Sequence, residues 1–277
     1  NNKEFLMPPH ASRALHAPLS LCLAAATALT AVPAAAQDEG ETTGKRTRVF
    51  AGPQFWPETP GSKKLVLGPF VDLSRAKPGE DFAFEAPDQS FGFDLVDDKK
   101  FDFGPTASII RKRKPEAVGG NLPKVGLTVE AGAFAQAWLT PALRVRVEAR
   151  KGLGGHGGWV GDVGADYVAR QGDDWLFSIG PRVSLGDSKY SRAYFGVAPA
   201  DVAASGLPAY DPKGGVQSVG VTAGYMRQLT RNWGVAAFAR YDRLVGDAAD
   251  SPVTRAFGSR NQPAFGIALS YTFGGKR

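Results

Sequence analysis

Apolar and polar residues alternate with a period of two along much of the chain. The pattern is clearest over 125–137, 142–150 and 263–273. Within 142–150 the aliphatic side chains occupy odd positions, and Arg144, Arg146, Glu148 and Arg150 occupy even positions. Period two places each set on one face of a β-strand, whereas a helix would mix them. The sequence therefore predicts an all-β protein.

The same rule predicts about twelve strands, an even number as expected for a single-chain bacterial barrel. They span 47–56, 64–74, 81–86, 90–96, 101–111, 125–137, 142–150, 158–169, 174–185, 216–228, 233–243 and 263–273. The segment 81–86 has the weakest pattern, so about ten strands is the alternative.

The predicted connections alternate in length. Short turns fall at 139–141, 171–173 and 230–232, and long loops at 112–124, 151–157, 186–215 and 244–262. This alternation is typical of an antiparallel transmembrane β-barrel with periplasmic turns and extracellular loops. Both termini are then expected in the periplasm. In the longest loop, Pro199 begins and Gly206 ends a predicted helical turn over 199–205.

Charged positions indicate which face of the sheet turns inward. Charges are costly against lipid and tolerated in a polar interior. The predicted lumen-facing residues are Arg144, Arg146, Glu148, Arg150, Asp162, Asp166, Arg182 and Arg240. Both signs occur, so the interior is either plugged by salt bridges or a narrow polar pore. Aromatic residues near strand ends are expected to form interfacial girdles: Phe55, Trp56, Trp138, Trp159, Trp175, Trp233, Tyr241, Tyr271 and Phe273.

The N-terminus has the features of an export signal. A weakly basic start after Met7, an apolar run over 19–32 and small residues at 34–36 predict a cleaved signal peptide over 7–36. Residues 1–6 are excluded as upstream of the true start. The expected organisation continues with a flexible N-terminus over 37–46, an outer-membrane barrel over 47–273 and a C-terminal extension over 274–277. We expect the chain in the cell outer membrane.

Composition excludes several other classes. Cleavage removes Cys22, the single cysteine of the 277 residues, so no disulfide or cysteine metal site is expected. The formal net charge of +6 is spread along the chain rather than clustered, which argues against a nucleic-acid partner.

His156, within a glycine run over 154–158, is the one candidate catalytic base after cleavage. A hydrolase would need it beside Ser184 or Ser188, with Asp162 or Asp166 as the orienting carboxylate. No Gly-x-Ser-x-Gly elbow is present. The favoured interpretation is a solvated loop histidine, and the chain is predicted not to be an enzyme.

Three further patterns receive ordinary interpretations. The glycine run over 152–158 lacks the lysine of a phosphate-binding loop, and predicts a loop with positive φ angles. Asp242, Asp247 and Asp250 match no calcium loop and are expected to be solvated. The basic run over 111–114 either contacts lipopolysaccharide phosphates or is solvated. No catalytic, cofactor-binding or metal residues, and no cofactor, are predicted.

Three segments resemble the MipA/OmpV family, also called the MltA-interacting protein family, of outer-membrane proteins. They are GLGGHGGWVGDVGADY at 152–167, YFGVAPADVAASGLPAY at 194–210, and residues 244–273. The resemblance covers roughly 120–273 and fits more loosely upstream, at 52–58 and 68–73. It implies a scaffold that brings together a lytic transglycosylase and a penicillin-binding protein in murein synthesis. Other members are discussed as porin-like proteins.

The leading functional hypothesis is accordingly a non-enzymatic scaffold of the cell envelope, surrounded by outer-membrane lipid and lipopolysaccharide. The alternative is a passive porin-like channel for small polar solutes, motivated by the inward charges. A third hypothesis, a lipid-modifying outer-membrane enzyme, depends on His156. Fold-level resemblance alone does not decide among them.

Overall fold

The computed structural model describes residues 46–77, 79–96 and 100–274. The predicted signal peptide, the upstream residues, nearly all of the flexible N-terminus and residues 275–277 of the extension lie outside these ranges. Within them, no helix is long and apolar enough to cross a membrane.

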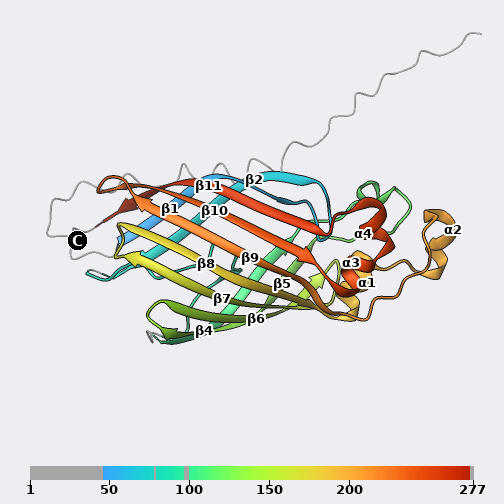
Figure 1. The fold of residues 1–277 in the computed structure, drawn as a ribbon, viewed down its shortest axis with the longest axis horizontal. Helices are drawn as coiled ribbons and strands as arrows, with labels where there is room; N and C mark the ends of the chain where they lie inside the picture. The colour runs from blue at the N-terminus through green and yellow to red at the C-terminus, as the bar shows by residue number, and fades with distance from the viewer. Residues whose placement is uncertain (1–45, 78, 97–99, 275–277) are drawn as a thin grey trace, which may run out of the picture. The chain divides into compact units, whose positions relative to one another are not determined.

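Residues 46–274 are dominated by one antiparallel sheet of eleven strands in the order β2-β1-β11-β10-β9-β8-β7-β6-β5-β4-β3 (Figure 1). The strands are β1 (Arg46–Pro57), β2 (Leu65–Ala76), β3 (Phe91–Gly92), β4 (Phe101–Ile110), β5 (Thr128–Thr140), β6 (Leu143–Gly154), β7 (Trp159–Gln171), β8 (Trp175–Gly186), β9 (Gly215–Gln228), β10 (Trp233–Leu244) and β11 (Asn261–Phe273). The first and last long strands, β1 and β11, pair directly, with Thr47 opposite Phe273. The all-β antiparallel prediction is confirmed.

The predicted strand over 81–86 is wrong. No strand forms there, although burial still alternates, with Phe82, Phe84 and Ala86 buried and the residues between them exposed. The predicted strand over 90–96 shrinks to β3, which pairs with β4 through Phe91 and Ala107. In the described part of the chain no ladder joins β2 to β3, so these strands form the two edges of the sheet.

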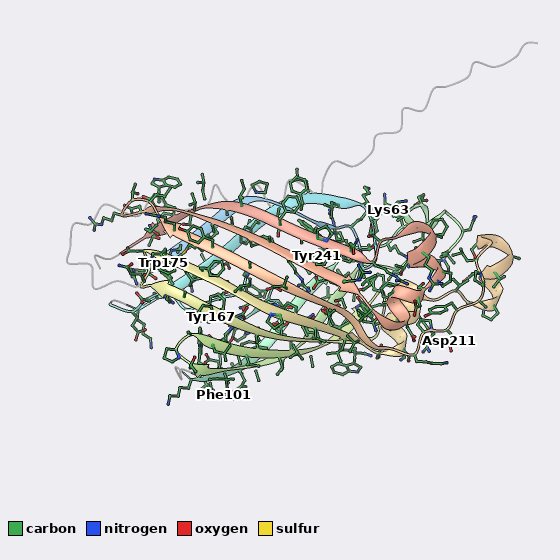
Figure 2. The ribbon with its side chains drawn as sticks, viewed as in Figure 1. Lys63, Phe101, Tyr167, Trp175, Asp211 and Tyr241 are labelled. Carbon is green, nitrogen blue, oxygen red and sulfur yellow. The ribbon has the colours of Figure 1, made fainter. Side chains whose placement is uncertain are left out.

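The sheet has an inverted polarity. Its convex face exposes large apolar side chains, and its concave face buries charged and polar ones. On β6, Arg144 is 1 % exposed, whereas Val147 is 44 % exposed. Phe101, Tyr167 and Tyr241 project from the outer surface (Figure 2). Exposing such an apolar face to water would be unfavourable. The arrangement instead suits a sheet whose outer face contacts the hydrocarbon core of a membrane.

The connections differ at the two ends of the sheet. One end has the tight turns β5–β6, β7–β8 and β9–β10, together with both ends of the described chain. The other end has the helices (Figure 1). These are η2 (Pro115–Val118), α1 (Ser188–Phe195), η3 (Pro199–Asp201), α2 (Val202–Ser205), α3 (Gly246–Asp250) and α4 (Pro252–Phe257). The helical turn predicted over 199–205 is confirmed as η3 and α2, ended by Gly206 in the left-handed conformation.

The predicted loop over 151–157 is shorter than expected, because β6 continues to Gly154 and β7 begins at Trp159. The tight connection needs positive φ angles at Gly154, Gly155 and Gly157, which explains the glycine run. Two small apolar cores hold the helical end together. One includes Tyr194, Phe195 and Ala248, and the other includes Val197 and Val253.

Candidate functional site

Residues 79–90, which we call the inserted segment, lie against the concave face of the sheet. Arg48 stacks over the Phe82 ring at 4.1 Å, and Arg144 stacks over the Phe84 ring at 4.5 Å. Phe82 donates its backbone N–H to Asp173 of the β7–β8 turn at 3.1 Å. The segment therefore occupies part of the interior, for which the sequence left two alternatives, a plug of salt bridges or a narrow polar pore.

A group of charged side chains from β5 to β8 and β10, which we call the ionic cluster, lies on one side of the inserted segment. Arg144 pairs with Asp166 at 2.7 Å, and Arg182 pairs with the other oxygen of Asp166 at 2.6 Å. Arg150 contacts three carboxylates: Glu130 at 3.0 Å, Asp162 at 2.6 Å, and Glu148. Arg146 pairs with Glu148 at 2.7 Å. These pairs follow directly from the strand alternation, because the partners are cross-strand or same-face neighbours.

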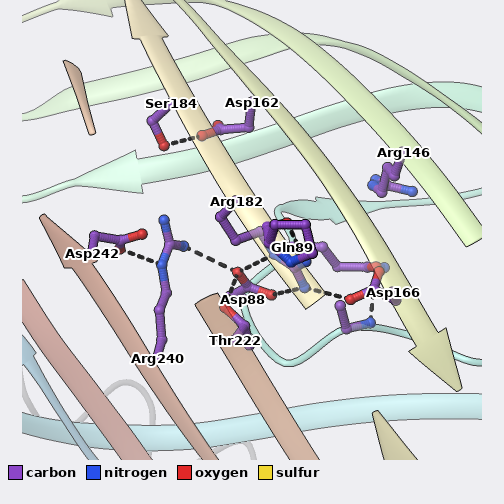
Figure 3. Close-up of polar contacts among 12 residues, drawn as sticks. Asp88, Gln89, Arg146, Asp162, Asp166, Arg182, Ser184, Thr222, Arg240 and Asp242 are labelled. Atoms are coloured by element: carbon purple, nitrogen blue, oxygen red, sulfur yellow. Dashed lines mark hydrogen bonds and ion pairs between the residues drawn. The ribbon is translucent and has the colours of Figure 1, made fainter. Parts of the chain in front are cut away.

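Asp88 ties the inserted segment to the ionic cluster (Figure 3). Its carboxylate pairs with Arg182 at 2.8 Å and with Arg240 at 3.3 Å, and accepts a hydrogen bond from Thr222 at 2.7 Å. Arg240 also pairs with Asp242 at 2.5 Å. One residue of the segment therefore bridges β8, β9 and β10.

The structure places every predicted lumen-facing residue on the concave face, around one cavity of about 300 Å³. Most are nearly inaccessible to solvent, whereas the Asp162 side chain keeps 36 % of its surface exposed. Sequence reasoning missed Asp88 and Glu130. Glu130 occupies an inward-facing position in the alternation of its strand and was predictable from that pattern. No local pattern marks Asp88, since its position depends on how the inserted segment folds back.

Because every guanidinium of the ionic cluster is paired with a carboxylate, the charges of opposite sign largely compensate inside the cavity. Buried ion pairs add little net stability over an apolar core, but removing one partner is expensive. The arrangement is therefore suited to holding the inserted segment in one place. The ionic cluster contains no row of unpaired arginines of the kind that would attract anions into the interior.

On the other side of the inserted segment a group of apolar side chains is buried, beside Arg48, which donates to the sulfur of Met226 at 2.9 Å. Phe50, Met226 and Ala268 are buried there, with Phe70 and Leu176 packed against them. We call this group, with Phe238, the apolar cluster, since the rings of Phe70 and Phe238 meet edge-on at 5.2 Å. It borders a second cavity of about 360 Å³.

His156 is not a solvated loop residue, so that prediction is wrong. It is 5 % exposed, and its Nε2 lies 3.0 Å from Glu130. Its Nδ1 accepts the backbone N–H of Gly158 at 3.1 Å, which leaves Nε2 as the donor to Glu130. A Cβ at Gly152 would lie 2.4 Å from the ring, so glycine is needed for this close approach.

Helix α1 covers His156 through two aromatic residues. The ring of Tyr190 lies 5.1 Å from the imidazole and the ring of Tyr194 5.9 Å. Burial, together with the nearby Glu130 carboxylate, raises the pKa of Tyr194 to about 12. The structure does not bring His156 together with the candidate serines. Ser184 donates to Asp162 at 2.6 Å, and the Ser188 hydroxyl accepts from Arg192 at 3.2 Å.

The remaining candidates are also dispersed. Asp242 is buried against Arg240 rather than solvated, Asp247 accepts the backbone N–H of Lys213 at 2.7 Å, and Asp250 pairs with Arg255 and Arg260. In the described ranges no group of three metal-ligating side chains gathers.

Two other expectations need correction. Within the basic run, Arg113 is 4 % exposed and donates to the carbonyl of Tyr194 at 2.7 Å, so it does not face solvent. Trp138 does not belong to an outer girdle, since it packs edge-on against Phe84 of the inserted segment at 6.1 Å. The rings of Trp233 and Tyr271 do meet near the turn end, edge-on, with their centroids 4.9 Å apart.

An apolar outer face, a charged interior, short turns at one end and long loops at the other define a β-barrel protein of the bacterial outer membrane. Within that class, residues 49–273 match the family described as MltA-interacting protein MipA. The chain belongs to this family, and the predicted resemblance is confirmed.

Comparison with curated proteins found no match. Among solved structures the chain is similar to an outer membrane channel from Pseudomonas putida F1, with 12 % identity, 86 % of this chain and 99 % of that chain covered, and a TM-score of 0.41. It is also similar to the KdgM porin, with 9 % identity, coverage of 82 % and 99 %, and a TM-score of 0.37.

Proposed function

We propose that this chain is a non-enzymatic scaffold of the cell envelope, an outer-membrane barrel that brings murein-remodelling enzymes together. The observation that carries the proposal is the filled interior, in which Asp88 fixes the inserted segment to Arg182 and Arg240. A barrel whose interior is occupied in this way is better suited to presenting a surface than to passing solutes. The description of its family as MltA-interacting also supports a protein partner.

The proposed partners are a lytic transglycosylase and a penicillin-binding protein, which act on murein in the periplasm. We therefore assign the binding surface to the turn end, where both ends of the described chain lie. This end has a cavity of about 520 Å³ whose lining includes Asp174, Arg231 and Asn232. Arg231 is exposed in the β9–β10 turn and is positioned to contact a partner.

The experiment measures binding of the purified transglycosylase, and separately of the penicillin-binding protein, to the full protein in lipid nanodiscs by surface plasmon resonance. We expect saturable binding of both. Arg231→Glu is expected to weaken binding about tenfold, because charge reversal at an interface costs roughly 1.4 kcal/mol or more. Arg255→Glu, an exposed arginine at the helical end, is the matched control and should bind like the unmodified protein. Absence of binding by both enzymes would refute the scaffold.

The second candidate, a passive channel for small polar solutes, is favoured by one observation. Cavities of about 300 Å³ and 520 Å³ remain, one beside the ionic cluster and one at the turn end. Conductance in a planar bilayer discriminates between the two functions. The scaffold predicts a closed barrel without discrete steps, whereas stable ion-selective steps together with a failure to capture either enzyme would establish the channel.

A further inference from the structure

The cavity of about 360 Å³ beside the apolar cluster extends to both edges of the sheet. Leu176 of β8 and Phe238 of β10 line its inner side. Val71 and Leu73 of β2 and Phe91 of β3 line the opposite side. Since no ladder joins β2 to β3 in the described ranges, the cavity has a mouth in the wall of the barrel, between these two strands.

The side chains around this mouth are apolar and exposed. Within residues 46–77, 79–96 and 100–274, Phe91 is the most exposed large apolar side chain, at 81 %. Val71 and Leu73 are 62 % and 51 % exposed. These residues continue the outer face that contacts the hydrocarbon core of the membrane. The cavity is therefore continuous with the lipid-facing surface, and hydrocarbon is the medium outside its mouth.

The free edge of β2 carries the backbone groups of alternate residues. Pro69 lies opposite Pro53 of β1, and this pair exchanges no hydrogen bonds because neither residue has an N–H. Hydrogen-bonded and non-hydrogen-bonded pairs alternate along an antiparallel ladder. Val71 and Leu73 follow Pro69 at intervals of two, so they also turn their backbone groups to the free edge.

This edge is poorly suited to pairing with another strand. Pro69 offers no donor, and its carbonyl accepts a hydrogen bond from the Gln54 side chain at 2.7 Å. The N–H of Leu73 donates to the Asp72 carboxylate at 2.8 Å. Prolines and other interruptions on an edge strand prevent the addition of a further strand. The mouth is therefore expected to stay open rather than to be closed by backbone pairing.

The charges that line the cavity are balanced in sign. They belong to Arg48, Arg170, Asp72 and Glu85. Both arginines already have partners, since Arg48 donates to the sulfur of Met226 at 2.9 Å and Arg170 to the carbonyl of Phe82 at 2.9 Å. A ligand of this cavity therefore needs no net charge. A hydrocarbon chain lying against the apolar cluster would gain the dispersion contacts that an empty space lacks.

We propose that this cavity binds one acyl chain of a phospholipid, which enters from the periplasmic leaflet between β2 and β3. Val71 and Leu73 lie in the half of β2 that ends at Ala76, opposite Arg46 at the turn end. In barrels of this class the end with short turns faces the periplasm. The headgroup remains at the membrane surface while the chain packs against the apolar cluster. This site is independent of the scaffold proposed for the turn end.

The test uses the full protein in phosphatidylcholine nanodiscs that contain a photoreactive phosphatidylcholine. One probe has a diazirine midway along an acyl chain, and the control probe has it in the headgroup. After illumination, mass spectrometry locates the labelled residues. We expect the chain probe, but not the headgroup probe, to label the inward residues Leu176, Met226 and Phe238. Chain-probe labels confined to outward residues such as Ile267, or equal labelling of the inward residues by both probes, would overturn the proposal.

A variant that fills the cavity separates chain entry from labelling at the outer face. Ala236→Phe adds a ring to the lining beside the apolar cluster and should abolish the labelling of Leu176 and Met226. Persistent labelling of Ile267 shows that the variant is still folded in the membrane. Ala239→Phe makes the same change at an exposed position of the same strand, and as the matched control it should leave inward labelling unchanged. Inward labelling that survives Ala236→Phe at full strength would contradict the assignment of this cavity.

Discussion

The two sides of the interior differ in what holds them together. On the ionic side, Arg150 alone contacts Glu130, Glu148 and Asp162, and nearly every charge has a fixed partner. On the apolar side, the rings of Phe70 and Phe238 meet edge-on, Phe70 packs against the cluster that contains Phe50, and an open cavity remains. The ionic side is therefore specified by directional contacts, and the apolar side by packing that tolerates changes in volume.

The inserted segment separates the two sides and contributes to both. Asp88 faces the ionic cluster, whereas Glu85 lines the apolar cavity. Asp88 lies in a turn that follows the alternating run 81–86, so one short stretch anchors itself on one side and leaves a carboxylate on the other. The comparison predicts that substitutions on the two sides will differ in how much stability they remove and in how that loss depends on side-chain volume.

The largest effect is expected for Arg150→Met. It leaves Glu130, Glu148 and Asp162 without their shared cation, and breaking a buried ion pair costs roughly 3–5 kcal/mol. Urea unfolding of the protein in detergent micelles, followed by circular dichroism, measures the loss. Arg192→Met is the matched control, since its pair with Asp211 at 3.4 Å is exposed and surface pairs contribute little to stability. A similar loss for both variants would contradict the contrast between the two sides.

A smaller effect is expected for the apolar cluster. Phe238→Ala removes a ring beside an existing cavity, and large-to-small changes of this kind cost roughly 2–5 kcal/mol. We expect the lower end, about 2–3 kcal/mol, because the ring already borders empty space. Phe238→Leu keeps most of the volume and should cost less than about 1.5 kcal/mol. If both variants lost as much stability as Arg150→Met in the same urea titration, volume tolerance on this side would be excluded.

The sheet itself was predictable because its signal is local. On β6 the alternation from Arg144 to Arg150 assigned each side chain to the correct face, and the same period located β11 and its outward Phe265 and Ile267. The inserted segment carries the same signal, with Phe82 and Phe84 on one face. Whether such a run joins a ladder depends on backbone partners elsewhere in the chain, and the alternation does not encode them.

The site was only partly predictable for a related reason. The alternation of inward and outward positions located the charged residues on the strands, whereas Asp88 reaches them from a segment that folds back. His156 was misjudged because its neighbouring glycines indicate a flexible loop. Its burial results from the contact with Glu130 and from the cover that Tyr190 of α1 provides. Such long-range contacts have no pattern in the residues near position 156.

The smallest effect concerns helix α1, which covers the ionic side at the helical end. Asp187 is its N-cap and accepts the backbone N–H of Tyr190 at 2.8 Å. Burial alone would raise the pKa of Asp187, but hydrogen bonds from the backbone outweigh it and lower the pKa below its ordinary value of 3.8. Asp187→Ala is expected to destabilise the helix by about 1 kcal/mol, as for other N-cap losses.

The sign of the pH dependence follows from the lowered pKa. A carboxylate with a depressed pKa in the folded state contributes its stability above the unfolded pKa, near pH 4, and loses it as pH falls through the lower folded value. The protection factors of residues 188–195, which compare amide hydrogen exchange with its intrinsic rate at each pH, should therefore fall in acid for the unmodified protein. Protection in Asp187→Ala should already be lower at neutral pH and respond less to acid. If the exchange of α1 in the unmodified protein showed no more acid dependence than in the variant, Asp187 would not be the cap that holds α1 in place.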